Sequence, residues 1–370
     1  MRLLFFIHSL SGGGAERVTA NLANHWAAKG WHITIVTLTS RSPDFYELHP
    51  AVRRISLELA GESRNVLAGV WKNLHRVRAL RQVLRQVQPD IALALMSTAN
   101  VILALATRGL ANVCAIGSER IHPPQLPLGA QWGALRRFTY GRLAAVVALT
   151  QESAEWLRVH TRAQRVPIIP NMALRPLAVQ APRLIPETVC VADRHILLAV
   201  GRLEKQKGID WLLESFMALA RKYYNWNLVI LGEGPERRVL ETQVQAFGLD
   251  GRVFLPGRAG NVGEWYERAD VYVMSSRFEG FPNALAEAMA HGLPAVSFDC
   301  ETGPRDIIRH ETDGLLVPPG DVVRLNVALD RLMGDAALRV QFAGRAVEAR
   351  ERFSMERIAG MWEELFAELL

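Results

Sequence analysis

The stretch RLLFFIHSLSGGGAERVTANLANHWAAKGWHITIVTL, residues 2–38, predicts how the first half of the chain folds. An apolar run at Leu3–Ile7 is followed by three glycines, by an amphipathic pattern over residues 15–29 and by a second apolar run at Ile33–Leu38. These features predict a strand, a turn, a helix and a strand. That succession implies a right-handed parallel crossover.

Further apolar runs extend this pattern over the first half of the chain. Each is followed by a turn or by a helical pattern, which is typical of a doubly wound sheet. We therefore predict an α/β domain over residues 1–171. The additional strands expected in it are Ile91–Leu95, Val113–Ile116 and Val146–Leu149.

The second half repeats this organisation after a break. Residues 172–194 carry Pro176, Pro182 and Pro186 without a sustained period, so we expect a linker there. A second α/β domain is predicted over residues 195–370, with a last helix able to pack back on the first domain. Two Rossmann-like, doubly wound domains facing a central cleft are thus expected, with ligand beyond the carboxyl ends of the strands. The strands expected in the second domain are Ile196–Val200, Leu228–Leu231, Val253–Leu255, Val271–Met274 and Ala295–Phe298, and the helices are Ile209–Arg221, Glu236–Phe247, Ala284–His291, Ala336–Arg350 and Met355–Leu369.

Charge is distributed unevenly along the 370 residues. The first 180 hold 21 Lys and Arg against 9 Asp and Glu, a net charge of +12, whereas the remainder carries −6. The stretch Lys72–Arg85 has five basic residues at helical spacing and no acid. Such a surface suits anionic lipid or an acceptor that bears a diphosphate, and a solvated helix face is the alternative interpretation. Nucleic acid is not an expected partner, because the aromatic-bearing motifs of single-strand binders are missing.

The cysteines and the apolar segments indicate in which cellular compartment the protein is expected. Cys114, Cys190 and Cys300 are odd in number and form no Cys-x-x-Cys pair, so we expect neither a disulfide framework nor a zinc site. No export signal is identified at the N-terminus. Polar residues interrupt the uncharged stretch Ile91–Thr107, which favours strand, loop and helix over a membrane span. A cytoplasmic location is expected, peripheral on the inner face of the cytoplasmic membrane.

Two loops that follow predicted strands carry candidate binding residues. Gly12, Gly13 and Gly14 open the first helix, where glycines admit a ligand close to the backbone and free N–H groups face an anion. A plain tight turn is the alternative, and the pattern is not the dinucleotide fingerprint. In the second half, Arg202 and Lys207 follow the first strand, where they could stabilise a diphosphate without magnesium.

The most specific motif is Glu279-Gly280-Phe281-Pro282-Asn283-Ala284-Leu285-Ala286-Glu287. Pro282 and Asn283 are helix start signals, so Glu279 lies in the preceding loop and Glu287 lies two turns along the helix. One carboxylate would project toward a sugar, and the other would accept hydrogen bonds from a ribose diol. The N–H groups at Gly280–Asn283, Phe281 among them, are placed to hold phosphate. A chance pair of glutamates is the alternative interpretation.

With these motifs the chain resembles the family 4 retaining glycosyltransferases, which have the two-domain GT-B fold. The resemblance covers nearly the whole length. Its motifs are Gly12–Gly14, Pro170-Asn171, Gly201-Arg202-Leu203 through Lys207-Gly208, Gly232-Glu233-Gly234-Pro235, Phe254-Leu255-Pro256-Gly257, Glu279 to Glu287, Gly303-Pro304 and Asp313-Gly314-Leu315-Leu316-Val317.

The resemblance implies roles for particular residues. Arg202 and Lys207 are expected to bind the diphosphate, Glu279 and Glu287 to contact the donor sugar and the ribose, and the loop around Gly257-Arg258 to hold the base. No cofactor or metal is expected besides the nucleotide-sugar co-substrate, and the sequence has no Asp-x-Asp pair to hold magnesium under a diphosphate.

The resemblance also implies a retaining, front-face displacement in which the leaving phosphate helps to deprotonate the acceptor. This chain departs from many relatives that place a histidine near the reacting carbon. Here Arg120 takes that place and His122 follows two residues later, so either is a candidate to face the sugar, and a structural role for His122 stays open.

The function expected from this resemblance is transfer of a hexose or N-acetylhexosamine from a nucleotide-diphosphate sugar, with UDP favoured, to a lipid-linked glycan in polysaccharide biosynthesis. Transfer to a soluble small-molecule acceptor is an alternative, and a non-catalytic sugar-nucleotide-binding protein is another. A Rossmann oxidoreductase or epimerase would need the dinucleotide fingerprint that is absent.

Overall fold

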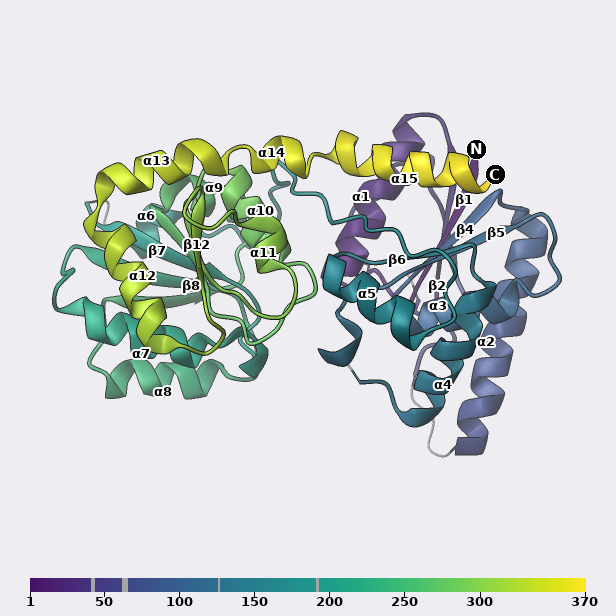
Figure 1. The fold of residues 1–370 in the computed structure, drawn as a ribbon, viewed down its shortest axis with the longest axis horizontal. Coiled ribbons are helices and arrows are strands. Elements are labelled where there is room, and N and C mark those ends of the chain that lie inside the picture. Colours follow the sequence, from purple (N-terminus) through teal and green to yellow (C-terminus); the bar gives the residue numbers. More distant parts are fainter. Residues whose placement is uncertain (41–43, 62–65, 126, 191–192) are drawn as a thin grey trace. The chain divides into compact units, whose positions relative to one another are not determined.

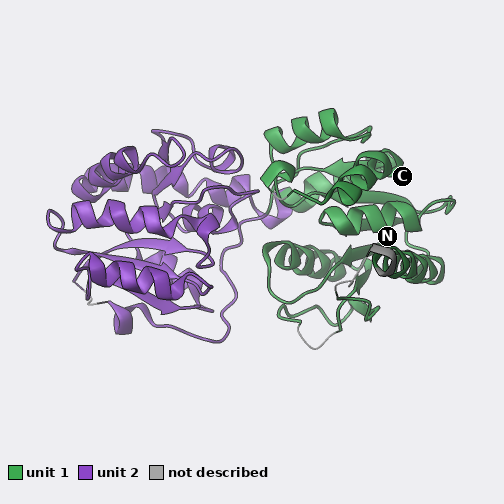
Figure 2. Cartoon of the chain, turned by 90° about the horizontal axis from the view of Figure 1, so that it is seen from below, with its two compact units in different colours: residues 1–171, 358–370 green, residues 172–357 purple. Residues whose placement is uncertain are grey.

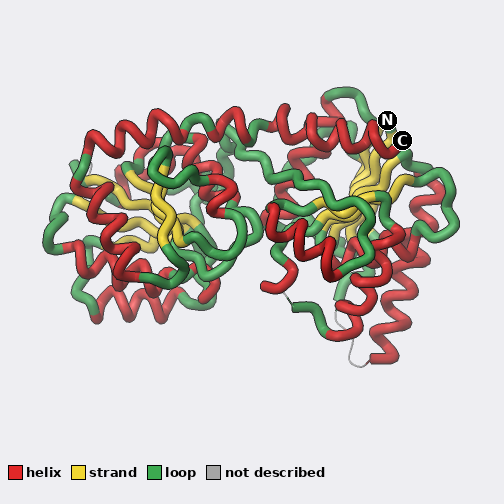
Figure 3. Tube along the Cα trace, in the orientation of Figure 1, coloured by secondary structure: helices red, strands yellow, loops and turns green. Residues whose placement is uncertain are grey.

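The computed structural model describes residues 1–40, 44–61, 66–125, 127–190 and 193–370. Its chain divides into two compact units (Figure 2). The first unit contains residues 1–171 and 358–370, and the second contains residues 172–357. Each unit has its own parallel sheet with helices around it, as the strands drawn in yellow in Figure 3 make plain.

The first unit is built on a six-stranded parallel sheet in the order β3-β2-β1-β4-β5-β6. Almost every residue of β1, β2 and β4 is buried, because helices cover both faces of a parallel sheet. Chain order reverses between β1 and β4, so the loops that leave these two strands diverge at one edge. The strands are β1 (Arg2–Ile7), β2 (His32–Thr37), β3 (Arg53–Ser56), β4 (Ile91–Leu95), β5 (Cys114–Ser118) and β6 (Ala145–Val147), and the helices are α1 (Gly14–Ala28), α2 (Val66–Val87), α3 (Ser97–Ala106), α4 (Ala130–Thr139), α5 (Gln151–His160) and, from Ile358 onward, α15 (Met355–Leu369), with short 3-10 turns at Pro123–Gln125 and Tyr140–Arg142.

The C-terminal helix α15 packs on the first unit, beside α1 (Figure 1). Trp26 of α1 donates from Nε1 to Glu363 Oε1 at 2.8 Å, and its ring lies 5.5 Å from that of Phe366. Both rings are fully buried. The last helix therefore contributes to the core of the first unit, although it lies at the far end of the chain.

The second unit has the same plan, with a six-stranded parallel sheet in the order β12-β11-β10-β7-β8-β9. Here the chain order reverses between β10 and β7. Its strands are β7 (His195–Val200), β8 (Trp226–Leu231), β9 (Val253–Gly257), β10 (Val271–Met274), β11 (Ala295–Phe298) and β12 (Gly314–Val317), and its helices are α6 (Pro186–Val189), α7 (Ile209–Ala220), α8 (Arg237–Ala246), α9 (Val262–Arg268), α10 (Asn283–Ala290), α11 (Pro304–Ile307), α12 (Val322–Gly334), α13 (Ala336–Ala346) and α14 (Ala349–Arg352), with a 3-10 turn at Lys205–Lys207.

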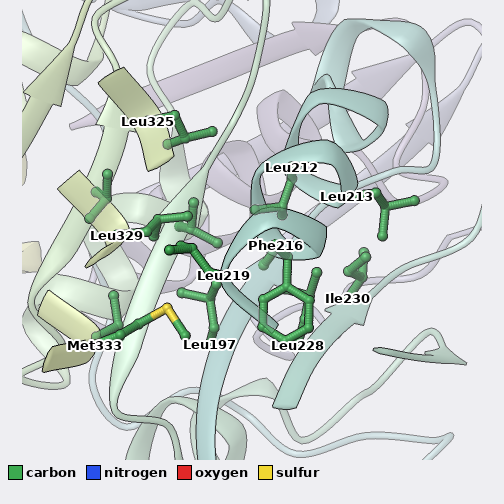
Figure 4. Close-up of a cluster of buried hydrophobic side chains, with 14 of the residues drawn as sticks. Leu197, Leu212, Leu213, Phe216, Leu219, Leu228, Ile230, Leu325, Leu329 and Met333 are labelled. Carbon is green, nitrogen blue, oxygen red and sulfur yellow. The ribbon is translucent and has the colours of Figure 1, made fainter. Parts of the chain in front are cut away.

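Helices α7 and α12 cover one face of this sheet. Phe216 of α7 is completely buried and lies with Leu197 of β7 and Leu228 of β8 in a continuous cluster, which Leu329 of α12 completes (Figure 4). Burial of such side chains contributes roughly 1.5–3 kcal/mol each. The cluster makes a rigid base for the loops at the carboxyl ends of β7 and β10.

The α/β fold with two doubly wound sheets is confirmed, and the structure adds elements that the sequence reading missed. Strands β3 and β12 were not predicted, and neither was α12. Both strands are four residues long and lie at sheet edges, and short runs of this kind carry little periodic signal. The stretch Ile91–Thr107 contains strand β4 and helix α3, as expected. Among the described residues, no helix combines the length and the apolar character that a membrane crossing requires.

Residues 172–194, expected as a linker, are grouped with the second unit. The described part of this segment is tied to α9 and the loop before it. Gln180 N donates to Gly260 O at 3.1 Å, and Asn261 exchanges two hydrogen bonds with the backbone of Leu184. These bonds satisfy backbone groups that a free linker would leave to water.

Candidate active site

The candidate site of the second unit lies where the chain order reverses, at the carboxyl ends of β7 and β10. The loop after β7 carries Arg202 and Lys207, and the loop after β10 leads through Glu279 into α10. Ligands of open α/β sheets bind at such a switch point, and β7 and β10 are adjacent strands of this sheet. The two predicted motifs of the second half are therefore neighbours in space.

Glycines let these two loops pack directly on one another. Gly208 has φ +59°, and a Cβ added there would lie 2.0 Å from the carbonyl oxygen of Ser275. Gly232, with φ +151°, approaches Gly201 so closely that a Cβ would lie 1.8 Å from its carbonyl oxygen. The hydroxyl of Ser275 donates to the carbonyl oxygen of Lys207 at 3.0 Å. The conformation of the lysine loop thus depends on the absence of side chains at these positions.

Lys207 and Glu279 form a salt bridge inside this arrangement. Lys207 Nζ lies 2.6 Å from Glu279 Oε1, and the hydroxyl of Ser276 donates to the same oxygen at 2.6 Å. Glu279 is 7% exposed. Thr302 donates to the backbone oxygen of Glu279 and holds the loop from the other side. The structure therefore brings together two predicted site residues that stand 72 positions apart.

The second glutamate of the motif lies on α10. Helix α10 begins at Asn283 after Pro282, as predicted, and Glu287 is 4% exposed. Burial raises the pKa of the neighbouring Tyr272 hydroxyl, and the charges of Glu279 and Glu287 raise this pKa further. The charges of both carboxylates therefore reach Tyr272, which is buried in strand β10.

Arg202 and the Gly257-Arg258 loop are placed differently. The side chain of Arg202 is two-thirds exposed and pairs with Glu204, Nη1 to Oε1, at 2.9 Å. Gly257 has φ +102° and lies against the carboxylate of Glu233, and Arg258 is exposed. Arg202 is not in contact with the Lys207–Glu279 pair in this structure, and its contact with Glu204 uses only one of the five N–H donors of its guanidinium.

In the first unit, the glycine loop follows β1 and opens α1 as predicted. Gly13 is the N-cap residue of α1, and Gly12 has φ +117°. The backbone oxygen of Gly13 accepts a hydrogen bond from the Tyr46 hydroxyl at 3.0 Å, while Gly14 is the first residue of the helix. A Cβ at Gly13 would lie 2.3 Å from a carboxylate oxygen of Glu16. The loop is thus a crowded turn whose free N–H groups belong to the start of α1.

Arg120 and His122 lie in the segment that follows β5, and both are buried. Arg120 Nη1 donates to the hydroxyl of Ser118 at 3.1 Å, and Nη2 donates to Asn171 Oδ1. His122 Nδ1 lies 3.0 Å from the hydroxyl of Ser153, at the start of α5. His122 therefore has a structural partner, in keeping with the alternative that the sequence left open.

Two models of glycosyltransferase families match this chain, one in each half. The model for glycosyl transferases group 1 matches residues 194–335, and the model for glycosyltransferase family 4 matches residues 12–173. The chain belongs to the family 4 glycosyltransferases. The two matches span the sheets of both units and include the glycine loop, the lysine loop and the Glu-x7-Glu motif.

Individual relatives of this glycosyltransferase cover it to different extents. An exopolysaccharide phosphotransferase of Streptomyces coelicolor is 34% identical over 84% of this chain, which spans 32% of that relative's length. A Campylobacter jejuni α-1,4-N-acetyl-D-galactosaminyltransferase, whose name includes a glycan on PP-undecaprenol, is 26% identical over 100% of this chain and 99% of its own. The structure of Anabaena HepE in complex with UDP and glucose matches with a TM-score of 0.79 at 20% identity, over 99% of each chain. This likeness shows the GT-B fold.

Sequence reading missed several residues that support the site of this glycosyltransferase. Arg277 binds both carboxylate oxygens of Asp210 at 2.9 and 2.7 Å, donates to the backbone of Lys205 and lies 3.7 Å from the ring centre of Trp211. It thereby braces the loop that carries Lys207. No local pattern marks Arg277 or Thr302, since their partners lie in distant segments. Ser276 contacts Glu279, only three residues away, but a serine at that spacing is not by itself a signal.

The nearest match in the sequence to an Asp-x-Asp magnesium motif is Asp299-x-Glu301, and its Asp299 forms a salt bridge within the protein. Both carboxylate oxygens of Asp299 accept from Arg305 at 2.9 Å. Asp299 therefore serves to hold the segment between β11 and α11.

The three cysteines are free thiols.

Proposed function

We propose that this protein is a retaining hexosyltransferase that moves a hexose or N-acetylhexosamine from a UDP-sugar to a glycan on a polyprenyl diphosphate, without a metal ion. The observation that carries the proposal is the Lys207–Glu279 pair at 2.6 Å, at the switch point of the second unit. The UDP in the Anabaena structure and the name of the Campylobacter relative support the choice of donor and acceptor class.

The Lys207–Glu279 pair can supply the electrostatic part of this chemistry. Lys207 Nζ carries three N–H groups, of which one is bonded to Glu279 among the described residues. The others can donate to the diphosphate as charge develops on it, and the N–H groups at the start of α10 can hold the same anion. Glu279 orients the ammonium and leaves Oε2 to accept from a hydroxyl of the sugar.

The transfer step is balanced without an enzyme nucleophile. The bond between the anomeric carbon and the phosphate oxygen breaks, and a bond to the acceptor oxygen forms on the same face. The acceptor proton passes to a phosphate oxygen of the leaving UDP. In the second unit, Glu287 would accept from the ribose diol, and Gly257 and Arg258 would border the base. In the first unit, Arg120 and His122 are the candidates to face the sugar.

Donor binding by purified protein tests this proposal. UDP-, GDP- and ADP-sugars are titrated in the presence of EDTA into the wild type and into the Glu287→Ala variant. We expect saturable binding of a UDP-sugar that EDTA does not change, and a loss of about 10–100-fold in affinity for the variant, since a hydrogen bond to a charged group contributes about 1.5–3 kcal/mol.

The control for this titration is Glu214→Ala, which removes an exposed glutamate from α7 of the same unit. Its affinity should equal that of the wild type. Absence of binding to every sugar nucleotide would rule out the proposed function. Binding that EDTA abolishes would rule out the metal-free mechanism alone, and the configuration of the product at the anomeric carbon decides between retention and inversion.

A lipid-linked acceptor would require a surface that meets the membrane, and the exposed side of helix α2 is the candidate for it. Trp71, Leu74, Arg78 and Arg85 are exposed at a spacing of three, four and seven residues, which places them on one side of the helix. Not all of the basic side chains in the stretch Lys72–Arg85 point freely into solvent. Two of its arginines donate to backbone oxygens of the first unit, namely Arg76 to Leu59 and Gly61, and Arg81 to Ala106 and Arg108.

Vesicle binding tests this surface. The Arg78→Glu, Arg85→Glu double variant is compared with Arg221→Glu, Arg238→Glu, an equal change of charge at exposed positions of the second unit. We expect the first to lose at least about tenfold in affinity for phosphatidylglycerol vesicles, because each basic residue near an anionic surface contributes about 1 kcal/mol. The second should lose little. Equal behaviour of the two variants would favour a soluble acceptor.

A further inference from the structure

Arg120 is a buried cation without a counter-charge in the described part of the chain. It is 6% exposed. Its partners are two neutral groups, the hydroxyl of Ser118 and the side-chain oxygen of Asn171. The Nε atom is buried and has no hydrogen-bond partner among the described residues. A guanidinium has five N–H donors, so most of its donor capacity is unused.

The adjacent acid does not neutralise this cation. Glu119 directs its carboxylate to other partners, accepting from the Tyr140 hydroxyl on Oε1 and from the Ser97 hydroxyl on Oε2 at 2.7 Å. Within residues 1–40, 44–61, 66–125, 127–190 and 193–370, no carboxylate lies within 4.0 Å of the Arg120 guanidinium. Burial lowers the pKa of Arg120 to about 9, which reflects the cost of removing a cation from water without compensation.

Ser118, one of the two partners of Arg120, is held by several hydrogen bonds to its backbone at the carboxyl ends of β4 and β5. Asn100 of α3 exchanges hydrogen bonds of 3.1 Å with both the N–H and the carbonyl of Ser118. Met96, directly after β4, donates its N–H to the same carbonyl and has φ +83° and ψ +148°, a region that residues other than glycine occupy at a cost of about 1–3 kcal/mol. A buried, unpaired cation and a strained residue in adjacent loops both lower stability, and such features gather at binding sites.

We propose that Arg120 is an anion-binding residue of the first unit, whose guanidinium receives a phosphate oxygen of a substrate diphosphate. The inference rests on the proposed function for the identity of that diphosphate. A guanidinium matches the oxygens of a phosphate with paired N–H donors, and the anion supplies the missing charge. The proposed sugars are neutral, so the donor and the lipid-linked acceptor each offer a diphosphate as their anionic group.

Binding of inorganic pyrophosphate to the full-length protein tests the site without turnover. We expect Arg120→Gln to weaken pyrophosphate binding by at least about tenfold or, where the wild type shows two classes of binding site, to abolish one of them. The melting temperature of this variant without ligand should equal or exceed that of the wild type. The matched control is Arg54→Gln, since Arg54 is also buried but is paired with Asp44 at 2.9 and 3.0 Å. This control should lose stability and keep its pyrophosphate affinity.

A second variant keeps the test decisive if Arg120→Gln fails to fold. Arg120→Lys retains the charge but not the paired donors, so it should fold and bind pyrophosphate more weakly by about three- to tenfold, in line with the geometric advantage of arginine. Unchanged pyrophosphate isotherms in the folded Arg120 variants would overturn the proposal.

Two further titrations identify the source of the phosphate. If UDP affinity falls in Arg120→Gln, the site receives the donor diphosphate. If UDP affinity is kept and that for a micellar prenyl diphosphate falls, it receives the acceptor diphosphate. Wild-type protein that binds neither compound, yet binds pyrophosphate through Arg120, would sink the glycosyltransfer proposal and leave the anion site standing. If Arg120→Gln binds UDP and the prenyl diphosphate with the affinities of the wild type, the assignment of Arg120 to a substrate diphosphate is overturned and the glycosyltransfer proposal stands.

Discussion

Replacing Lys207 by Met is expected to lower kcat/KM for sugar transfer by about 10²–10³-fold, the range found when one preorganised donor to a developing charge is removed. Lys207 Nζ is held 2.6 Å from Glu279 Oε1, in a loop whose backbone is fixed by Gly208 and Ser275. Methionine is an unbranched apolar side chain only one atom shorter, and it removes the charge. Initial rates of transfer from a UDP-sugar measure the effect.

Lys205→Met is the matched control for this variant. It removes an equal charge from the same loop at an exposed position. Its side chain has no described role, because the contact of Lys205 with Arg277 uses the backbone oxygen. The control should retain most of the activity. Similar losses in both variants would show that the loop acts through its total charge, and full activity of Lys207→Met would exclude the proposed leaving-group role.

Replacing Gly208 by Ala is expected to destabilise the second unit by about 2–5 kcal/mol, the sum of two contributions. The left-handed conformation at φ +59° costs a residue with a Cβ about 1–2 kcal/mol. The new Cβ would also meet the Ser275 carbonyl oxygen at 2.0 Å, and overpacking of this kind adds about 1–3 kcal/mol. Since the contact is with backbone, relief requires the two site loops to separate.

Gly248→Ala provides the comparison for the strained conformation alone. Gly248 has φ +64° and nothing within 4 Å of an added Cβ. It should cost only about 1–2 kcal/mol. Chemical denaturation followed by circular dichroism measures both variants, and donor titration shows whether Gly208→Ala also weakens binding. Equal destabilisation would mean that the loop contact contributes nothing beyond the backbone conformation.

Much of the candidate site could be located from local signals. Apolar runs placed β1, β4, β7 and β10, and a Pro-Asn pair placed the start of α10. Partners were not predictable in the same way. Nothing in the stretch around Arg277 indicates Asp210 or Trp211, and the basic pattern at Lys72–Arg85 did not reveal that Arg76 and Arg81 bind backbone oxygens.

The sequence by itself determined that this protein has two parallel sheets and which loops bear its glycines, cations and carboxylates. Hydrophobic period, helix start signals and glycine turns are local properties, so they can be read along the chain. Only the tertiary structure decided that Lys207 meets Glu279, and that Arg120 is buried without a carboxylate among the described residues. The physical reason is that these neighbours are set by strand order and loop packing, which bring segments distant in sequence together at the carboxyl ends of the parallel strands.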